Sequence, residues 1–222
     1  MKLITFLSPT GPRPGLALDD AVGLDLLAAD PELPRRWNEL LTAPHLERVR
    51  SLARRALAPG ETTPASPLFP LAGVALLPPV PEPSKIVAVG LNYRDHAEEQ
   101  HKPLPERPLL FAKAPSCLQG PFGPIVLDAG LMQVDSEAEL AVVIGKAGRA
   151  IPRERAAEHV GGYMCFNDVS DREAQYADKQ WFRGKSLDTG GPCGPWIVTP
   201  DELPPLARGL AVTGRLNGQV MQ

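Results

Sequence analysis

The sequence contains few cysteines, no long apolar run and no surplus of basic charge. Its 3 cysteines (Cys117, Cys165 and Cys193) form no CxxC pair. Their odd number and spacing argue against a disulfide framework or a zinc ribbon and favour the reducing cytoplasm. No apolar stretch approaches the length that spans a membrane, and residues 1–7 are too short for a signal-peptide core.

Basic residues are dispersed along the chain. Lys and Arg total 23 against 26 Asp and Glu, for a formal net charge of −3. A nucleic-acid-binding protein would carry a basic patch or stripe, so this class is not expected. The densest basic stretch is residues 45–57. Its apolar residues Leu46, Val49 and Ala53 recur at helical spacing, which predicts an amphipathic surface helix rather than a membrane or partner helix.

Proline and glycine are abundant, with 26 and 20 residues respectively. They predict many turns and irregular loops and argue against a helical bundle. Apolar runs such as residues 86–89 and 140–144 recur at the length of strands, which argues against a disordered chain. Because strands outnumber helices in this pattern, we expect an α+β fold with a mixed, rolled or barrel-like sheet.

Three regions of different texture follow one another along the chain. Residues 1–58 are expected to form a small α+β domain that begins with a strand at residues 2–7. Residues 59–83 are rich in proline and are expected to be an extended linker over the surface, with one short strand around residues 74–77. Residues 84–222 form the expected main domain, and they contain the candidate functional residues.

The main domain is expected to contain mostly strands. A helix is predicted to begin at Tyr93 after the cap Asn92, and another to span residues 152–159. Strands are predicted at residues 86–89, 108–113, 125–127, 137–144, 162–167 and 196–198. Near the end, alternation over residues 210–216 and the turn Asn217-Gly218 predict a β-hairpin whose second strand begins at Gln219.

Three carboxylates form a candidate metal site. Glu137 and Glu139 are two apart at the head of an apolar strand, so their side chains point to the same face. Side by side they repel each other and resist burial, and a divalent cation such as Mg²⁺, Mn²⁺ or Ca²⁺ would reverse that. Asp168 follows another predicted strand and would complete one face of an octahedral ion. The alternatives are a solvated edge strand for the glutamates and a turn for Asn167-Asp168.

Two further segments contain candidate catalytic groups. His96 and Glu99 are three apart on the predicted helix, so the carboxylate can orient the imidazole as a general base towards water. The alternative is an exposed helical pair. Lys185 lies between glycines and is expected on a loop, where a lysine is usually solvated but near a metal can stabilise an oxyanion or deliver a proton. No phosphate-binding loop and no Gly-x-Ser-x-Gly elbow occurs, and the cysteines are expected to serve in packing.

Five segments, taken in order, resemble the fumarylacetoacetate hydrolase family. They lie within residues 84–222. They are Gly90-Leu91-Asn92-Tyr93 leading to His96, residues 134–145, Gly162-Tyr163 leading to Asn167 and Asp168, residues 183–189, and Gly194-Pro195-Trp196. Each segment alone is a weak signal, but five in this order are specific. The small N-terminal unit also resembles the one that precedes this domain in many relatives.

The resemblance implies a mixed β-roll, usually assembled as a homodimer, with Mg²⁺ or Mn²⁺ in the roll. By position it implies a role for eight residues: the metal ligands Glu137, Glu139 and Asp168, the water-activating dyad His96 and Glu99, Lys185 near the substrate carbonyl, and the pocket residues Arg172 and Gln175. Of these assignments, the one for the pocket residues rests on the least specific motif.

The family resemblance implies hydrolysis of a carbon–carbon bond in a small β-diketo or acylpyruvate-type acid. The alternative is isomerisation or decarboxylation of a related keto acid of the hydroxymuconate or oxaloacetate type, because all three chemistries pass through an enolate. Family members continue past Asn217-Gly218 with more sheet and a Thr-Gly-Thr-Pro-like loop, so we expect the domain to be incomplete at its C-terminus. A non-catalytic remnant of the fold is the alternative from another class.

Overall fold

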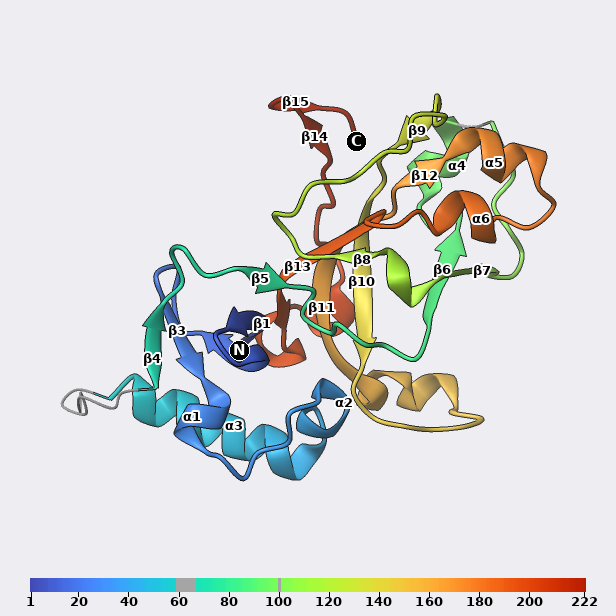
Figure 1. Cartoon of the computed structure of the whole chain (residues 1–222). Helices are drawn as coiled ribbons and strands as arrows, with labels where there is room; N and C mark the ends of the chain where they lie inside the picture. Colours follow the sequence, from blue (N-terminus) through green and yellow to red (C-terminus); the bar gives the residue numbers. More distant parts are fainter. Residues whose placement is uncertain (59–66, 100) are drawn as a thin grey trace.

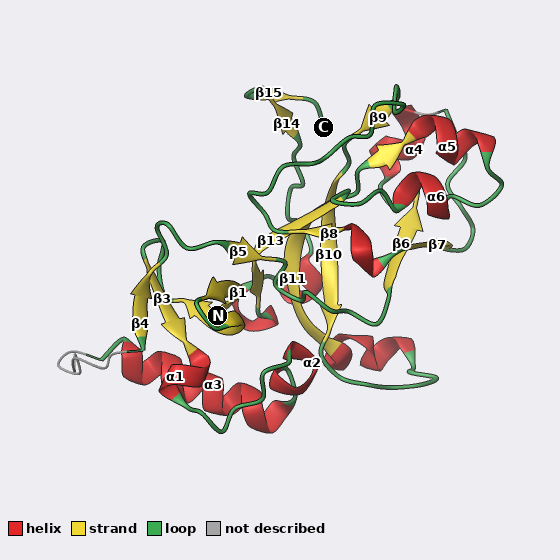
Figure 2. Cartoon of the chain, in the orientation of Figure 1, coloured by secondary structure: helices red, strands yellow, loops and turns green. Residues whose placement is uncertain are grey.

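The computed structural model describes residues 1–58, 67–99 and 101–222 (Figure 1). The first strands and helices gather in one lobe, and most elements after residue 84 gather in a second (Figure 1). Strands and short helices are mixed along the chain (Figure 2), so the predicted α+β class is confirmed. Among the helices of these ranges, none is long and apolar enough to cross a lipid bilayer.

Nine strands of the described residues form one sheet that connects the two lobes. Its main path runs through β10 (Ala138–Ile144), β11 (Val160–Asn167), β13 (Gly191–Val198), β1 (Lys2–Ser8), β2 (Gly11–Ala17), β3 (Val22–Asp25) and β4 (Leu68–Pro70). Off this path, β5 (Leu76–Leu77) pairs with β1, and β8 (Leu118–Gln119) pairs in parallel with β13. The sheet is therefore mixed, and over the described residues it stays open, with β10 and β4 at its ends.

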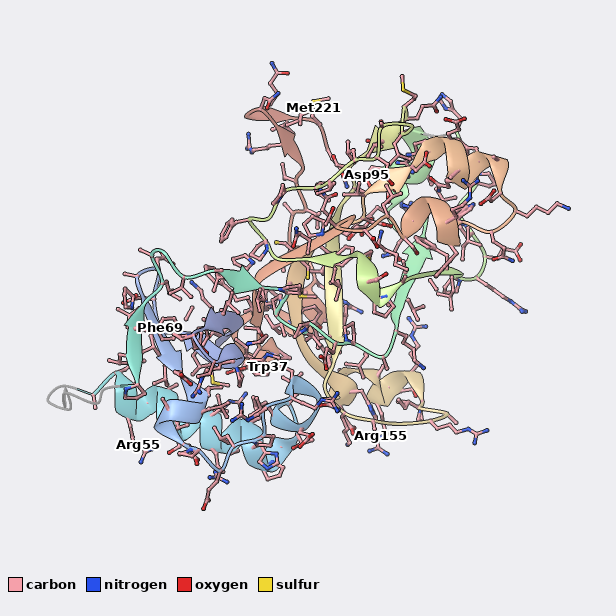
Figure 3. All side chains as sticks on the ribbon, viewed as in Figure 1. Trp37, Arg55, Phe69, Asp95, Arg155 and Met221 are labelled. Atoms are coloured by element: carbon pink, nitrogen blue, oxygen red, sulfur yellow. The ribbon has the colours of Figure 1, made fainter. Side chains whose placement is uncertain are left out.

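The first lobe surrounds an apolar core. Three helices complete it: α1 (Leu26–Ala29), α2 (Trp37–Leu40) and α3 (Ala43–Ala56). Leu3, Leu24 and Leu40 are fully buried in one cluster, which Ile197 of β13 joins from the other end of the chain. Figure 3 shows Trp37 and Phe69 inside this lobe and Arg55 on its outside.

The predicted helix over residues 45–57 is confirmed as α3. Its buried residues are Val49 and Leu52, one helical turn apart, and its arginines Arg54 and Arg55 are exposed in the last turn. Of the proline-rich stretch, residues 59–66 lie outside the described residues. The rest adds β4 beside β3 and β5 beside β1, so the strand expected around residues 74–77 is confirmed.

The second lobe is built from short elements around the head of β10. The strands β6 (Ile86–Gly90) and β7 (Leu109–Lys113) form a two-stranded sheet, and the helix α4 (Arg94–Glu99) lies between them in the sequence. The other elements are β9 (Val134–Asp135) paired with β12 (Ser170–Asp171), α5 (Arg172–Ala177), α6 (Phe182–Lys185), and the 3₁₀ helices η1 (Pro115–Cys117), η2 (Arg153–His159), η3 (Pro200–Glu202) and η4 (Pro205–Ala207).

Three local predictions were wrong in whole or in part. Residues 125–127 form no strand, because Val126 donates its N–H to the Thr189 hydroxyl at 2.8 Å and the stretch is exposed. The helix expected over residues 152–159 is the 3₁₀ helix η2. Residues 210–214 are irregular, although the hairpin itself is confirmed as β14 (Arg215–Leu216) and β15 (Gln219–Val220). Its turn residues Asn217 and Gly218 have the positive φ angles, 51° and 83°, that such a turn requires.

Candidate active site

The antiparallel pairing of β10 with β11 brings three carboxylates to one end of the sheet. Ala138 at the start of β10 faces Asn167 at the end of β11. One residue further, the Asp168 N–H donates to the Glu137 carbonyl at 2.9 Å. Glu137, Glu139 and Asp168 therefore lie at the same end of the sheet, although about thirty residues separate the two strands' ends in the sequence.

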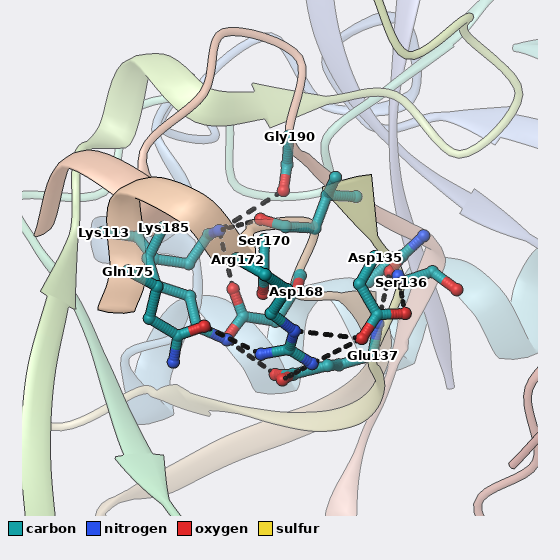
Figure 4. Close-up of polar contacts among 12 residues, drawn as sticks. Lys113, Asp135, Ser136, Glu137, Asp168, Ser170, Arg172, Gln175, Lys185 and Gly190 are labelled. Atoms are coloured by element: carbon teal, nitrogen blue, oxygen red, sulfur yellow. Dashed lines mark hydrogen bonds and ion pairs between the residues drawn. The ribbon is translucent and has the colours of Figure 1, made fainter. Parts of the chain in front are cut away.

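Two buried lysines form ion pairs with two of these carboxylates, Glu137 and Asp168. Lys185 Nζ lies 2.7 Å from Glu137 Oε2 and 2.9 Å from Asp168 Oδ2, and Lys113 Nζ lies 2.7 Å from Asp168 Oδ1 (Figure 4). Lys113 also donates to the carbonyls of Val169 and Gly190 at 3.4 and 3.3 Å. The two lysine side chains are only 1–2% exposed. A charge buried so deeply is stable only when it is paired and hydrogen-bonded, as both are here.

A guanidinium group holds the outer side of the cluster. Arg172 contacts Glu137 Oε1 at 2.7 Å and Asp135 Oδ2 at 2.6 Å, and it donates to Gln175 Oε1 at 2.8 Å (Figure 4). As a result, both oxygens of Glu137 and both oxygens of Asp168 have a cationic partner. Lys113, Lys185 and Arg172 thus contact the carboxylates of Asp135, Glu137 and Asp168.

Glu139 differs from its two neighbours. Burial, together with the negative charges of Glu137 and Asp168, raises the pKa of Glu139 to about 7, and a hydrogen bond with the Tyr93 side chain partly opposes this shift. A raised pKa means that the carboxylate form is disfavoured at this position. A divalent cation beside the three groups would stabilise that form, and hard carboxylate oxygens are the ligands that Mg²⁺ and Mn²⁺ prefer.

The donor set therefore fits a divalent cation, with Glu137, Glu139 and Asp168 as the residues that would hold it. Across the ranges that the structure describes, no three His, Cys, Asp or Glu side chains already converge as a preformed cation site. In this structure Lys185 bridges two of the three carboxylates, and Arg172 contacts the other oxygen of Glu137.

The position of Lys185 corrects the sequence-based expectation of a solvated loop. Lys185 ends the short helix α6 and is buried. Gly184 permits this packing, because a Cβ at that position would lie 2.7 Å from both the Asp171 carbonyl and the Gln175 N–H nitrogen. The small residue lets α6 approach α5, and this contact carries the lysine under the carboxylates. Its glycine neighbour thus signals close helix packing rather than a loop.

A cleft of about 1460 Å³ opens onto these groups. Its lining includes the predicted site residues His96, Glu137, Glu139, Asp168, Arg172, Gln175 and Lys185. The imidazole-bearing His96 is half-buried on α4. Glu99, at the end of the same helix, is exposed and does not belong to the lining. The structure thus gathers seven of the eight candidate residues around one cleft, and it leaves Glu99 outside.

The sequence did not predict two residues of this site, Lys113 and Tyr93. Lys113 ends an apolar strand, and a charged residue directly after such a run was the one signal available. Tyr93 belongs to the segment that leads to His96, yet nothing local indicates its contact with Glu139.

Burial raises the pKa of Cys193 to about 12 and raises that of Cys117, so the packing role predicted for these two thiols is supported. Cys165 is exposed, and for it the prediction was wrong.

Comparison with known proteins places this geometry in a family. The pattern described as "Fumarylacetoacetate (FAA) hydrolase C-terminal" matches residues 85–222. The whole chain is 40% identical to the mitochondrial oxaloacetate tautomerase FAHD2A of Homo sapiens, of which it spans 70%.

Two solved structures are similar in fold as well as in sequence. The 5-carboxymethyl-2-hydroxymuconate delta-isomerase of Mycobacterium smegmatis is 37% identical with a TM-score of 0.64, over 90% of this chain and 66% of the isomerase. The maleylpyruvate hydrolase of Sphingobium sp. SYK-6, solved with manganese(II) and pyruvate, is 33% identical with a TM-score of 0.67, over 90% of this chain and 68% of the hydrolase. Sequence pattern, overall similarity and fold agree, and the chain belongs to the fumarylacetoacetate hydrolase family.

Proposed function

We propose that this protein is a metal-dependent tautomerase that interconverts the keto and enol forms of a small keto acid of the oxaloacetate type. The observation that carries the proposal is a buried ammonium group, Lys185, on the wall of a cleft that His96 also lines. Tautomerisation needs one group that removes a proton from carbon and one that delivers a proton to oxygen. These two side chains can supply both.

The residue roles follow from charge and position. The imidazole of His96 takes a proton from the carbon next to the keto group, and the electron pair of that C–H bond forms the new carbon–carbon double bond. Lys185 gives a proton to the former keto oxygen, and solvent returns a proton from the imidazolium to the lysine. The Lys185 ammonium has three N–H donors, and Glu137 and Asp168 occupy two of them. The third is available to a substrate in the cleft.

Arg172 and Gln175 are proposed to bind a carboxylate of the substrate. Arg172 is already ordered by Asp135, Glu137 and Gln175, so its guanidinium is fixed before a ligand arrives. A divalent cation held by Glu137, Glu139 and Asp168, when bound, supplies Lewis-acid stabilisation of the negative charge that develops on the enolate.

Isomerisation is favoured over carbon–carbon bond hydrolysis by the position of Glu99. Hydrolysis requires a water molecule activated by His96 with Glu99 as its orienting partner, and Glu99 is exposed outside the cleft lining. Tautomerisation needs no activated water. The similarity to proteins named oxaloacetate tautomerases supports the same choice, whereas the likeness to a maleylpyruvate hydrolase keeps hydrolysis as the competing activity.

The proposal is tested by following the ultraviolet absorbance of enol-oxaloacetate after it is mixed with purified protein and Mg²⁺. The decay should accelerate in proportion to protein concentration and return to the spontaneous rate with EDTA. Acylpyruvates and a hydroxymuconate, assayed in parallel, report hydrolysis and isomerisation of the other substrate types, and pyruvate release from oxaloacetate reports decarboxylation. Turnover of acylpyruvates with no effect on the enol of oxaloacetate would refute the proposal.

Three further predictions concern the cation, the oligomeric state and the cellular location of this protein. Mg²⁺ or Mn²⁺ is the proposed cation, and a homodimer the proposed assembly, which light scattering on the purified protein would test. The cytoplasm predicted from cysteine usage is not supported by the human relative, which is named a mitochondrial protein. Fractionation of the source cells would decide between the two locations.

A further inference from the structure

The ammonium group of Lys185 occupies oxygens that a cation would need. It lies 2.7 Å from Glu137 Oε2 and 2.9 Å from Asp168 Oδ2, so it bridges two of the three proposed metal ligands. The other oxygen of Glu137 faces Arg172, and the other oxygen of Asp168 faces Lys113. A divalent cation at these carboxylates must therefore share oxygens with positive charges that are already in contact with them.

We propose that the Lys185 ammonium competes with divalent cations for the carboxylates of Glu137 and Asp168 and so lowers the affinity of this site for the cation. The same lysine is required for the proton transfer, which explains why a group that weakens cation binding is present here. The inference rests on the proposed function, specifically on Glu137, Glu139 and Asp168 as the cation ligands. It goes beyond that function by assigning Lys185 two effects of opposite sign, one on cation binding and one on turnover.

The surroundings of the two lysines explain why Lys185 is the stronger competitor. Lys113 is anchored by the backbone carbonyls of Val169 and Gly190, and it contacts the far oxygen of Asp168. Within the described residues, the polar partners of the Lys185 ammonium are the two carboxylates, and the Phe111 ring lies 5.2 Å from it. Lys185 thus competes at two ligands, whereas Lys113 acts on one of them from behind.

The experiment is isothermal titration calorimetry of Mn²⁺ into the wild type and into Lys185→Met, which keeps an unbranched side chain one atom shorter and removes its charge. The variant should bind Mn²⁺ more tightly, on the order of tenfold, because one positive charge has been removed a few ångströms from a doubly charged ion. Its turnover of enol-oxaloacetate should fall at least a hundredfold, in the range of a lost general acid. A merely structural lysine would lower both quantities.

A matched control is Lys179→Met, which removes the same charge from an exposed residue of the segment between α5 and α6. It should change Mn²⁺ affinity by less than about twofold, because an exposed charge is screened. Equal or weaker Mn²⁺ binding by Lys185→Met than by wild type would overturn the inference while leaving the proposed function in place. Absence of Mn²⁺ binding by both the wild type and Lys185→Met would overturn the metal site itself, and with it both proposals.

A second measurement covers the case in which Lys185→Met is poorly folded without a cation. Mn²⁺ at a fixed excess should raise the melting temperature of the variant by more than it raises that of the wild type, since tighter binding to the folded state gives a larger stabilisation. An equal or smaller shift would contradict the competition.

Discussion

The two lobes of this protein bury different kinds of side chain. The first lobe buries leucines: Leu3, Leu24 and Leu40 lie in one cluster at 0–1% exposure. The second lobe buries charges, among them Lys113, Lys185 and Asp168. Large apolar side chains that are exposed to solvent are rare in the first lobe and common in the second. Among the described residues, the first 58 contain two of them, Leu7 and Leu57, and all the others follow residue 84.

This difference suggests that the first lobe contributes mainly to stability and the second mainly to ligand binding and chemistry. Apolar burial contributes to stability without directional requirements, whereas a buried ion pair is costly to desolvate and adds little net stability. A cluster of carboxylates, lysines and an arginine is therefore better explained by what it binds than by what it stabilises. We expect substitutions in the first lobe to change unfolding free energy, and substitutions in the second to change catalysis or ligand binding as well.

The largest effect is expected for His96→Ala. Loss of the proposed general base should lower kcat for enol-oxaloacetate by about 10²–10⁴-fold, the usual contribution of such a group. Cation affinity should stay close to that of the wild type, because His96 is not a proposed ligand. Steady-state kinetics and Mn²⁺ titration check the two parts separately.

His101→Asn is the control for His96→Ala. His101 is exposed, and its φ of 52° lies in the left-handed region that asparagine tolerates, so the substitution adds little strain. Its kcat should remain near the wild-type value. If His96→Ala instead weakened cation binding and left kcat at saturating metal unchanged, the role of His96 as a base would be wrong.

The next largest effect is expected for Lys113→Met, which should lower the unfolding free energy through a change in the second lobe. It leaves Asp168 Oδ1 buried without its ammonium partner, and breaking one side of a buried pair typically costs about 3–5 kcal/mol. Urea denaturation measures the loss. The double variant Lys113→Met/Asp168→Asn should recover part of it, because the unpaired charge is gone. A loss below about 1 kcal/mol in the single variant would show that Asp168 can stay buried without the Lys113 ammonium.

Leu40→Ala tests the first lobe. Leu40 is fully buried in the apolar cluster, and truncation of such a side chain costs about 2–5 kcal/mol. The kcat of the protein that remains folded should not change, since Leu40 lies outside the cleft lining. Arg55→Ala on the exposed face of α3 is the control, with an expected change within about 0.5 kcal/mol. A fall in kcat at full folding would mean that the two lobes are not separable in this way.

Local pattern predicted the fold better than it predicted the site. The strand β10 was predicted from an apolar run of strand length, which is a property of the local sequence alone. The failure over residues 125–127 has a tertiary cause, since a hydroxyl from Thr189, more than sixty residues away, takes the N–H that a strand partner would have bound.

The same limit applies to the site. Glu137, Glu139 and Asp168 were found because they sit beside recognisable strands in an order shared with a family. Lys113 was not, because its partner Asp168 lies 55 residues further on and becomes its neighbour only in the folded chain. Lys185 was placed on a loop because its glycine neighbour suggested a turn, whereas Gly184 actually serves the contact between α5 and α6.

The smallest expected effects come from one substitution made in both lobes. Asp25 and Asp171 are both N-cap residues, and Asp25 also pairs with Arg13, whose Nε lies 2.7 Å from Asp25 Oδ2. Asp25 accepts from the N–H groups of Leu27 and Ala28 at 3.0 Å, and Asp171 accepts from those of Glu173 and Ala174 at 3.1 and 3.3 Å. Replacing either aspartate with alanine removes a cap, which should cost about 0.5–2 kcal/mol in unfolding free energy. For Asp25→Ala the lost ion pair with Arg13 adds to this cost.

Their functional consequences should differ, because the two capped helices carry different residues. The buried residues of helix α1, Leu26 and Leu27, belong to the apolar core, so Asp25→Ala should leave both kcat and KM unchanged. Helix α5 begins with Arg172 and contains Gln175, the proposed carboxylate-binding pair, so a frayed first turn in Asp171→Ala should raise KM for oxaloacetate severalfold. Kinetics at full folding compares the two variants directly. Equal KM values would show that the guanidinium is held by Asp135 and Glu137 rather than by its helix.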